Sequence, residues 1–151
     1  MDEASNMQAT GVDSAVPPDG FVPLASRSPF IQALGAPLFE RLVDPTCRHL
    51  TVRVAEQHCN ADGHAHGGFI VTIADFALTY GTFREGDRPP AITLHISTDF
   101  MRPVRLGDWL EVVVSTRKQS ENLLFADALI LAAGEVVARA SGVFRPMRRS
   151  P

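Results

Sequence analysis

The sequence predicts one α+β domain in which a curved antiparallel sheet wraps a single long apolar helix. Residues 67–83 form an apolar run with one acid, Asp75, before Arg84, which is typical of a helix buried on most sides. After Pro90 the chain alternates apolar and polar residues in short runs, which predicts strands with one apolar face. Such a sheet needs a cover, and the helix is the only long apolar element available. We therefore expect the sheet to wrap the helix.

Length and composition limit the class of protein. The chain has 151 residues and a formal net charge of −3, which fits one domain and argues against a nucleic-acid partner. The N-terminus lacks a basic segment and an apolar run, and the helix is too short to cross a bilayer, so we expect neither export nor membrane insertion. Cys47 and Cys59 fall on one extended pattern, which separates them beyond disulfide reach. We expect free thiols and a cytoplasmic location.

The N-terminal part of the chain shows little periodicity. Residues 1–26 mix Asn, Ser, Asp, Gly and Pro, so we interpret them as a flexible arm or one that lies over the surface. The single domain is expected over residues 27–151. A short helix is predicted between Ser28, as its cap, and Gly35, where it ends. The side chains expected on its buried face are Phe30, Ile31 and Leu34.

Extended patterns account for most of the remaining chain. Residues 37–43 and 46–58 are interpreted as one bent strand, broken at Asp44 and Pro45. The next run predicts a half-buried strand. Its apolar face would carry Ile92, Leu94, Ile96 and Phe100, and its polar face Thr93, His95, Ser97 and Asp99. Three further strands at 109–118, 123–132 and 136–145 are separated by turns that suit hairpins. The prediction is a helix followed by an antiparallel meander.

Asp75 and the two glycines at the helix start are the candidate functional residues. A carboxylate in apolar surroundings must be hydrogen-bonded, protonated or compensated by function. A structural bond to Thr72 or Thr79, one turn away, would also explain Asp75. Gly67 and Gly68 have amides without intrahelical partners, which suit an anion or a polarised carbonyl. Taken alone, the two glycines would indicate only a turn before a helix.

Helix geometry separates these two features. Asp75 lies seven residues past Gly68, on the same face but about 10 Å along the axis at about 1.5 Å per residue. Asp75 therefore cannot touch a carbonyl held at its own helix start. If both act on one atom, the acid must come from a second copy of the helix running the other way. This predicts a two-fold dimer with sites at its interface.

Residues 60–68, Asn-Ala-Asp-Gly-His-Ala-His-Gly-Gly, followed by Asp75, resemble the hotdog-fold acyl-CoA thioesterases, most nearly the phenylacetate-degradation group. The pattern Asn-x5-His-Gly-Gly-x6-Asp is far more specific than a lone Gly-Gly. The order of elements agrees from about residue 30 to residue 145. The resemblance implies a long helix wrapped by a curved antiparallel sheet, in dimers whose active sites lie between subunits.

The resemblance also implies roles for individual residues. Asp75 matches the family's acid, which acts as nucleophile or as general base for a water. Gly67 and Gly68 match the backbone donors that polarise the thioester carbonyl. Asn60 matches a side chain near the reacting carbonyl or water, and His66 matches the histidine that heads the helix.

Further positions are implied less directly. By its spacing after the acid, Thr93 resembles the hydroxyl that some members use to hold the water. Side chains near Phe76 and Tyr80 would shape the acyl pocket, for which family analogy suggests aromatic or medium-chain acyl groups. Arg102 and Arg145 flank strand ends and could attract the phosphates of coenzyme A. Solvated charge is the more common explanation for such residues, and the phosphate role is favoured only slightly, for Arg145.

The sequence disfavours two other kinds of active site, a metal site and a Ser-His-Asp triad. His58, Cys59, Asp62, His64 and His66 crowd one loop, but their spacing fits no standard zinc motif, so we expect no metal and no redox cofactor. The nearest string to a serine elbow, residues 140–142, lies within a strand pattern, which disfavours a Ser-His-Asp triad.

The sequence therefore predicts an acyl-CoA thioesterase that releases a free acid and coenzyme A. Two alternatives remain open at this point. One is a hydratase or dehydratase of the same fold, and the other is a non-catalytic acyl-CoA-binding protein. The expected partners are acyl-CoA and further copies of the chain, as a dimer or a dimer of dimers.

Overall fold

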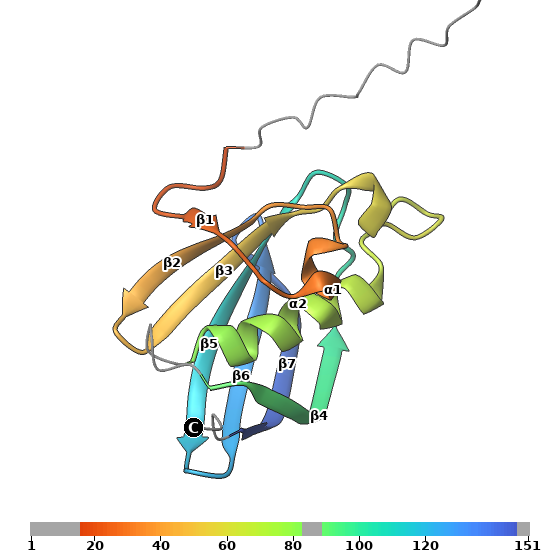
Figure 1. The fold of residues 1–151 in the computed structure, drawn as a ribbon. Coiled ribbons are helices and arrows are strands. Elements are labelled where there is room, and N and C mark those ends of the chain that lie inside the picture. The colour runs from red at the N-terminus through yellow and green to blue at the C-terminus, as the bar shows by residue number, and fades with distance from the viewer. Residues whose placement is uncertain (1–15, 83–88, 148–151) are drawn as a thin grey trace, which may run out of the picture.

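The computed structural model describes residues 16–82 and 89–147 and confirms the α+β class (Figure 1). Within these residues seven strands form one antiparallel sheet in the order β1-β2-β3-β5-β6-β7-β4. The strands are β1 (Val22–Leu24), β2 (Leu38–Asp44), β3 (Cys47–Arg53), β4 (Ala91–Phe100), β5 (Trp109–Gln119), β6 (Leu124–Ala132) and β7 (Glu135–Pro146). The helices are α1 (Pro29–Gln32), the short 3₁₀ helix η1 (Glu56–His58) and α2 (Gly67–Tyr80).

Helix α2 lies across one face of the sheet and contacts β3 to β7 (Figure 1). It ends at Tyr80, with Gly81 as its C-cap, within the apolar run, whose last residue Phe83 lies outside the described residues. None of the described helices is long and apolar enough to span a bilayer.

The sheet begins inside the segment expected to be an arm. Strand β1 pairs with β2, with Val22 opposite Glu40 and Leu24 opposite Leu38. The expectation of an arm without regular structure is therefore wrong for residues 22–24. A strand of three residues at the sheet edge is too short to show an alternating pattern, and an edge position tolerates Pro23. Residues 1–15 lie outside the described residues.

Strands β2 and β3 form a hairpin, so the expected single bent strand is wrong. Their turn is closed by Asp44, whose Oδ1 accepts hydrogen bonds from the backbone N–H and the hydroxyl of Thr46, each at 2.8 Å. Strand β3 stops at Arg53, and η1 follows. Cys47 lies on β3 and Cys59 after η1, and both are free thiols, as expected.

The C-terminal strands form the expected hairpins, but β4 is placed differently. Strands β5, β6 and β7 are consecutive neighbours, whereas β4 pairs with β7 at the far side of the sheet. The turn between β6 and β7 contains Ala133 (φ 50°) and Gly134 (φ 77°), the positive φ pair of a two-residue hairpin turn. A strict meander is therefore wrong at β4, because the chain crosses from β4 over the sheet to β5.

Strand β4 is one edge of the sheet, opposite the β1 edge, and three of its apolar side chains are exposed. Ile92, Leu94 and Phe100 are 50%, 54% and 53% exposed. The predicted half-buried strand with a covered apolar face is therefore wrong for these three side chains. An edge strand lacks a neighbour on one side, so side chains near its rim stay open in a single chain.

Helix α1 also exposes a side chain expected in the core. Ser28 caps the helix as predicted, with its Oγ accepting the Ile31 N–H at 3.4 Å. Ile31 is buried, but Phe30 is 66% exposed. Successive side chains on a helix point about 100° apart, so a helix that buries Ile31 turns Phe30 outward.

Small side chains on the inner face of the sheet let α2 approach closely. Several inner positions of β6 and β7 hold buried small residues: Ala126, Ala128, Ala138, Ala140 and Gly142. A Cβ at Gly142 would lie 2.4 Å from the ring of Phe144 and 3.2 Å from Leu78 of α2. Phe144 and Leu78 are themselves fully buried. Glycine is therefore required here for packing.

We predict that Gly142→Ala destabilises the fold by about 1–3 kcal/mol, because the added methyl must displace the Phe144 ring in a close-packed core. Urea denaturation gives the free energy of unfolding. Ser141→Ala, at the exposed neighbouring position, is the matched control. Equal stability of Gly142→Ala and the wild type would contradict this account of the core.

Candidate active site

One backbone N–H at the start of α2, that of Gly67, is open, which here means that it has no hydrogen-bond acceptor among the described residues. His66 is the cap of the helix, and its Nδ1 accepts a hydrogen bond from the Gly68 N–H at 2.9 Å. Among the described residues, no acceptor faces the Gly67 N–H. Of the two amides predicted to be donors, that of Gly68 is therefore used by the cap and that of Gly67 is open.

The loop before α2 is held by its own polar groups. Asn60 Oδ1 accepts hydrogen bonds from the N–H groups of Asp62 (3.0 Å) and His64 (3.1 Å). The Ala65 N–H donates to Val104 O at 2.8 Å, and the His66 N–H donates to His58 O, also at 2.8 Å. The side chain of Asn60 thus shapes the loop that leads into the first turn of α2.

A hollow of about 370 Å³ brings together three predicted site residues, Asn60, Gly67 and Arg102. Phe100, at the end of β4, also lines it, and a Cβ at Gly67 would lie 3.3 Å from the Phe100 ring. Arg102 is exposed and forms an ion pair with Glu135 at 2.6 Å. The open amide therefore faces a concave surface with a cation at its rim.

Asp75 is half-buried and bonded to the predicted hydroxyl. Thr93 Oγ1 donates a hydrogen bond to Asp75 Oδ1 at 2.7 Å. Thr72 and Thr79 instead donate to helix carbonyls, Thr72 to Gly68 O at 2.8 Å and Thr79 to Phe76 O at 3.1 Å. The alternative that a hydroxyl one turn away on α2 satisfies the Asp75 carboxylate is therefore wrong.

A β-bulge in β4 turns Thr93 toward α2. Thr93 pairs with Phe144 and His95 with Val143, so Leu94 is the extra residue. Simple alternation would place Thr93 on the face opposite Ile96. The extra residue changes the phase, and Thr93 and Ile96 both face α2.

The predicted substrate-binding residues are distributed around the helix. The rings of Phe76 and Tyr80 stack with centroids 5.3 Å apart. Phe76 and Asp75 line a groove of about 290 Å³, and Tyr80 is not one of its lining residues. Arg145 is exposed on β7 opposite Ile92 and lines neither this groove nor the hollow at Gly67.

In a single chain Gly67 and Asp75 therefore belong to different concavities. Gly67 lies in the hollow beside Arg102, and Asp75 lies in the groove beside Phe76. This agrees with the separation of about 10 Å that helix geometry imposes. Within one chain the two groups cannot act on the same atom.

The buried histidine of the histidine-rich loop, His58, is held by backbone groups. His58 is buried and stacked on Phe69 at 4.1 Å. Its Nδ1 accepts from the Ala55 N–H at 2.9 Å, and its Nε2 lies 2.6 Å from Leu34 O. Both ring nitrogens thus bind backbone. No group of three His, Cys, Asp or Glu side chains within residues 16–82 and 89–147 is arranged to hold a metal ion.

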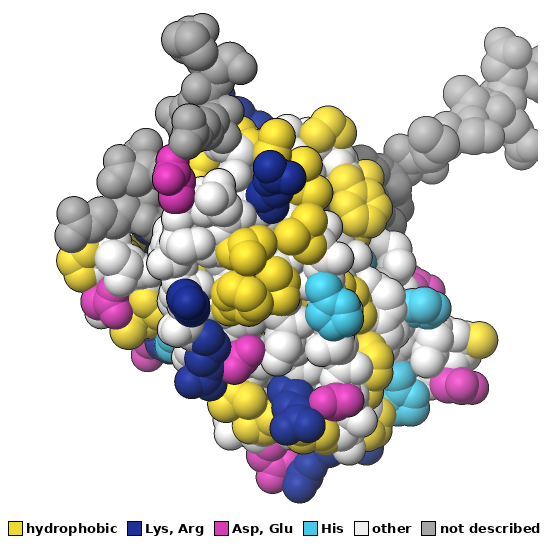
Figure 2. Space-filling view, turned by 90° about the horizontal axis from the view of Figure 1, so that it is seen from below, with side chains coloured by type: hydrophobic (Ala, Val, Ile, Leu, Met, Phe, Trp, Pro, Cys, Tyr) yellow, Lys and Arg dark blue, Asp and Glu magenta, His cyan; other side chains and the backbone are white. Residues whose placement is uncertain are grey.

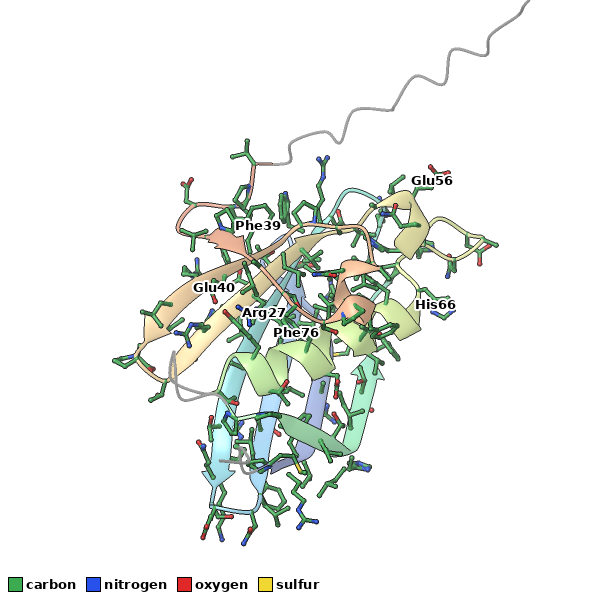
Figure 3. The ribbon with its side chains drawn as sticks, viewed as in Figure 1. Arg27, Phe39, Glu40, Glu56, His66 and Phe76 are labelled. Carbon is green, nitrogen blue, oxygen red and sulfur yellow. The ribbon has the colours of Figure 1, made fainter. Side chains whose placement is uncertain are left out.

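The groove beside Asp75 includes four residues from outside α2 that sequence reasoning did not assign to a site: Ser28, Phe30 and Ile31 of the α1 region, and Ile96 of β4. Their sequence patterns were typical of a cap and a core face. Only the positions of α1 (Figure 3) and of β4 against α2 bring them beside the acid.

Comparisons with known proteins bear on this site. The sequence model of the Thioesterase superfamily matches residues 62–138. A Pseudomonas aeruginosa protein named as a candidate esterase is 39% identical over 128 residues, which cover 84% of this chain and 95% of that protein. Human acyl-coenzyme A thioesterase 13 is 28% identical over 90 residues, which cover 58% of this chain and 64% of the human protein.

Solved structures share the fold. The phenylacetic acid degradation protein PaaI from Thermus thermophilus, solved as a mutant, has 27% identity and a TM-score of 0.68, covering 80% of this chain and 100% of that chain. The E. coli PaaI protein has 24% identity and a TM-score of 0.70, covering 82% and 88%. At its lower identity, the E. coli protein supports the fold alone.

We predict that His66→Ala lowers the free energy of unfolding by about 1 kcal/mol, because the Gly68 amide loses its capping acceptor. His66→Asn should keep most of the stability, since asparagine is a favoured cap. Urea denaturation measures both, with His64→Ala in the same loop as control. A His66→Ala protein as stable as the wild type would show that the ring does not cap α2.

Proposed function

This chain belongs to the Thioesterase superfamily and is a thioester hydrolase, and from that premise we propose that it hydrolyses acyl-CoA at sites shared between two subunits. Family membership also confirms the resemblance to hotdog-fold thioesterases that the sequence suggested. The observation that carries the proposal is the pair of polar features on α2, the open Gly67 amide and the Asp75 carboxylate bonded to Thr93.

The amide and the acid suit the two halves of the reaction. Attack on a thioester carbonyl places negative charge on its oxygen, and a fixed N–H at a helix start stabilises that charge without moving. The Gly67 N–H is the donor for this oxygen, with Asn60 beside it in the same hollow. His66 acts through the helix, by capping it and so fixing the direction of the Gly67 amide.

Asp75 drives the attack on the carbonyl carbon. As a general base it takes a proton from water while the water oxygen forms the new C–O bond, and the thiolate of coenzyme A leaves and is protonated. As a nucleophile it forms an anhydride that water then opens. In either role Thr93 Oγ1 orients the carboxylate through its 2.7 Å bond to Oδ1.

A second subunit is required to bring the amide and the acid to one carbon. Strand β4 supports this arrangement, because it is a sheet edge with exposed apolar side chains at Ile92, Leu94 and Phe100, and the exposed Met101 follows it directly. Figure 2 views the molecule from below, and hydrophobic side chains gather near the middle of that face. Pairing of two such edges about a two-fold axis would align two copies of α2 in opposite directions.

An arginine at the rim of the hollow beside Gly67 suits the phosphates of coenzyme A. Arg102 lies in the hollow that contains the Gly67 amide, and its ion pair with Glu135 is exposed, so a phosphate group can compete for the guanidinium at little cost. Arg145 lies on β7 opposite Ile92, outside the hollow and the groove of its own chain. We therefore assign Arg102, and not Arg145, to the phosphates of coenzyme A within this proposal.

We predict that Asp75→Asn lowers the rate of thiol release from acyl-CoA by about 10²–10⁴-fold, because asparagine cannot take a proton. The fold should persist, since the asparagine carbonyl still accepts the Thr93 hydrogen bond. A thiol-trapping dye and a panel of linear and aromatic acyl-CoA substrates provide the measurement.

The matched control is Asp127→Asn. Asp127 also carries a carboxylate, but it lies on β6, forms an ion pair with Arg117 and lines a different groove, which Ser97 also lines. It should keep wild-type turnover. Undiminished turnover by Asp75→Asn would refute the role of Asp75. Acyl-CoA binding by the wild type without thiol release would instead favour a non-catalytic binding protein.

If the amide and the acid of each site come from different subunits, two inactive variants should restore activity when mixed. The first variant is Asp75→Asn and the second is Gly67→Pro. Proline lacks the N–H, yet it is favoured at the first position of a helix, so α2 should remain intact. We expect Asp75→Asn and Gly67→Pro each to be nearly inactive alone. In a mixed dimer one site carries both changes and the other carries neither.

Subunits reassorted from equal amounts of the two variants should recover about a quarter of wild-type activity, since half of the dimers are mixed and half of their sites are intact. Size-exclusion chromatography checks the assembly. No recovery from verified mixed dimers would place the amide and the acid of each site in one subunit, against the proposal.

A further inference from the structure

Helix α1 is firmly held although it is only four residues long. Ile31 anchors it in the core, and Ser28 caps it. At its far end the carbonyl of Leu34 faces Nε2 of the buried His58 at 2.6 Å and accepts a further bond from Gln57 Nε2 at 3.3 Å. These contacts fix α1 against the segment that leads into α2.

This anchored helix presents one large side chain to the outside. Phe30 is 66% exposed, an unusual position for a phenylalanine on a helix whose neighbouring residue is buried. Its ring lines two hollows on the surface of α2. One is the groove of about 290 Å³ that contains Asp75, and the other is a hollow of about 490 Å³ beside His66 and Gly68.

The two hollows meet at Phe30 and Thr72, the two residues that line both. These two residues therefore lie at the boundary between the hollows. Figure 3 shows α1 across the part of α2 between His66, at the helix start, and Phe76. The ring of Phe30 therefore stands between a short groove and a larger space beyond it.

The groove beside Asp75 suits an apolar chain. Ile31, Val71, Phe76 and Ile96 supply its walls. Its two threonine hydroxyls already donate hydrogen bonds, Thr72 to Gly68 O and Thr79 to Phe76 O. Apart from Asp75 and Ser28, the groove thus has few free polar partners, and apolar carbon would leave the hydrogen bonds of the two threonines intact.

We propose that this groove holds the acyl group and that Phe30 sets its upper length by closing the passage to the second hollow. The inference rests on the proposed hydrolysis of acyl-CoA, because Asp75 at the groove marks where the reacting carbon lies. The groove volume is at the lower end of the range for small-molecule sites, which favours a short or single-ring acyl group.

Replacing the ring should join the two spaces. We expect Phe30→Ala to raise kcat/KM for decanoyl-CoA relative to butyryl-CoA by about tenfold or more, since one methylene in an apolar pocket already changes selectivity by about 10–200-fold. Phe30→Trp should shift the ratio the other way. The gain should appear in KM for the long substrate, because Phe30 touches the chain and not the reacting atoms.

The matched control is Leu42→Ala, an equally exposed apolar residue on β2 that lines neither hollow. It should leave the substrate profile unchanged. If Phe30→Ala does not fold, Phe30→Leu provides the same comparison, and circular dichroism checks each variant. Unchanged selectivity in folded Phe30 variants would overturn the inference, provided that the wild type releases thiol. Absence of thiol release by the wild type would instead refute the proposed function.

Discussion

The packing of α2 against small side chains of β6 and β7 is the contact on which the rest of the structure depends. Because Gly142 and the alanines beside it carry little side-chain volume, the helix lies deep on the sheet, with Ile73 and Leu78 fully buried. Each such side chain contributes about 1.5–3 kcal/mol when removed from water. The far end of the helix is equally close, since a Cβ at Gly81 would lie 2.6 Å from Arg48 O. The close packing therefore fixes the position of α2 on the sheet, and with it the directions of the Gly67 amide and the Asp75 carboxylate.

Strand β4 combines two properties that follow from its place at the sheet edge. Its bulge at Leu94 turns Thr93 toward Asp75, and a bulge is cheapest at an edge, where it interrupts pairing on one side only. The same lack of a second neighbour leaves Ile92 and Phe100 exposed. The strand that orients the acid is thus also the strand best suited to meet another subunit.

The polar groups of α2 are divided along its length, and so are the spaces around it. The hollow at Gly67 has a backbone donor and a cation, which suit the carbonyl and the phosphates of a thioester. The groove at Asp75 is otherwise apolar and is bounded by Phe30 of α1. If the thioester carbon reacts between the hollow at Gly67 and the groove at Asp75, charge would hold the coenzyme end of the substrate. Hydrophobic contact would hold its acyl end.

The sequence by itself determined the α+β class and the position of α2, because these depend on periodicity and on spacing within a few turns. Asn60, His66 and Thr93 were identified as candidate site residues only through the family pattern, and the hydrogen bond between Thr93 and Asp75 is known from the structure alone. The tertiary structure alone decided that β4 lies beside β7, that Leu94 is a bulge and that Phe30 stands outside the core. These features depend on contacts between segments far apart in the chain. The alternation of apolar and polar residues within one segment does not indicate which other segment it will contact.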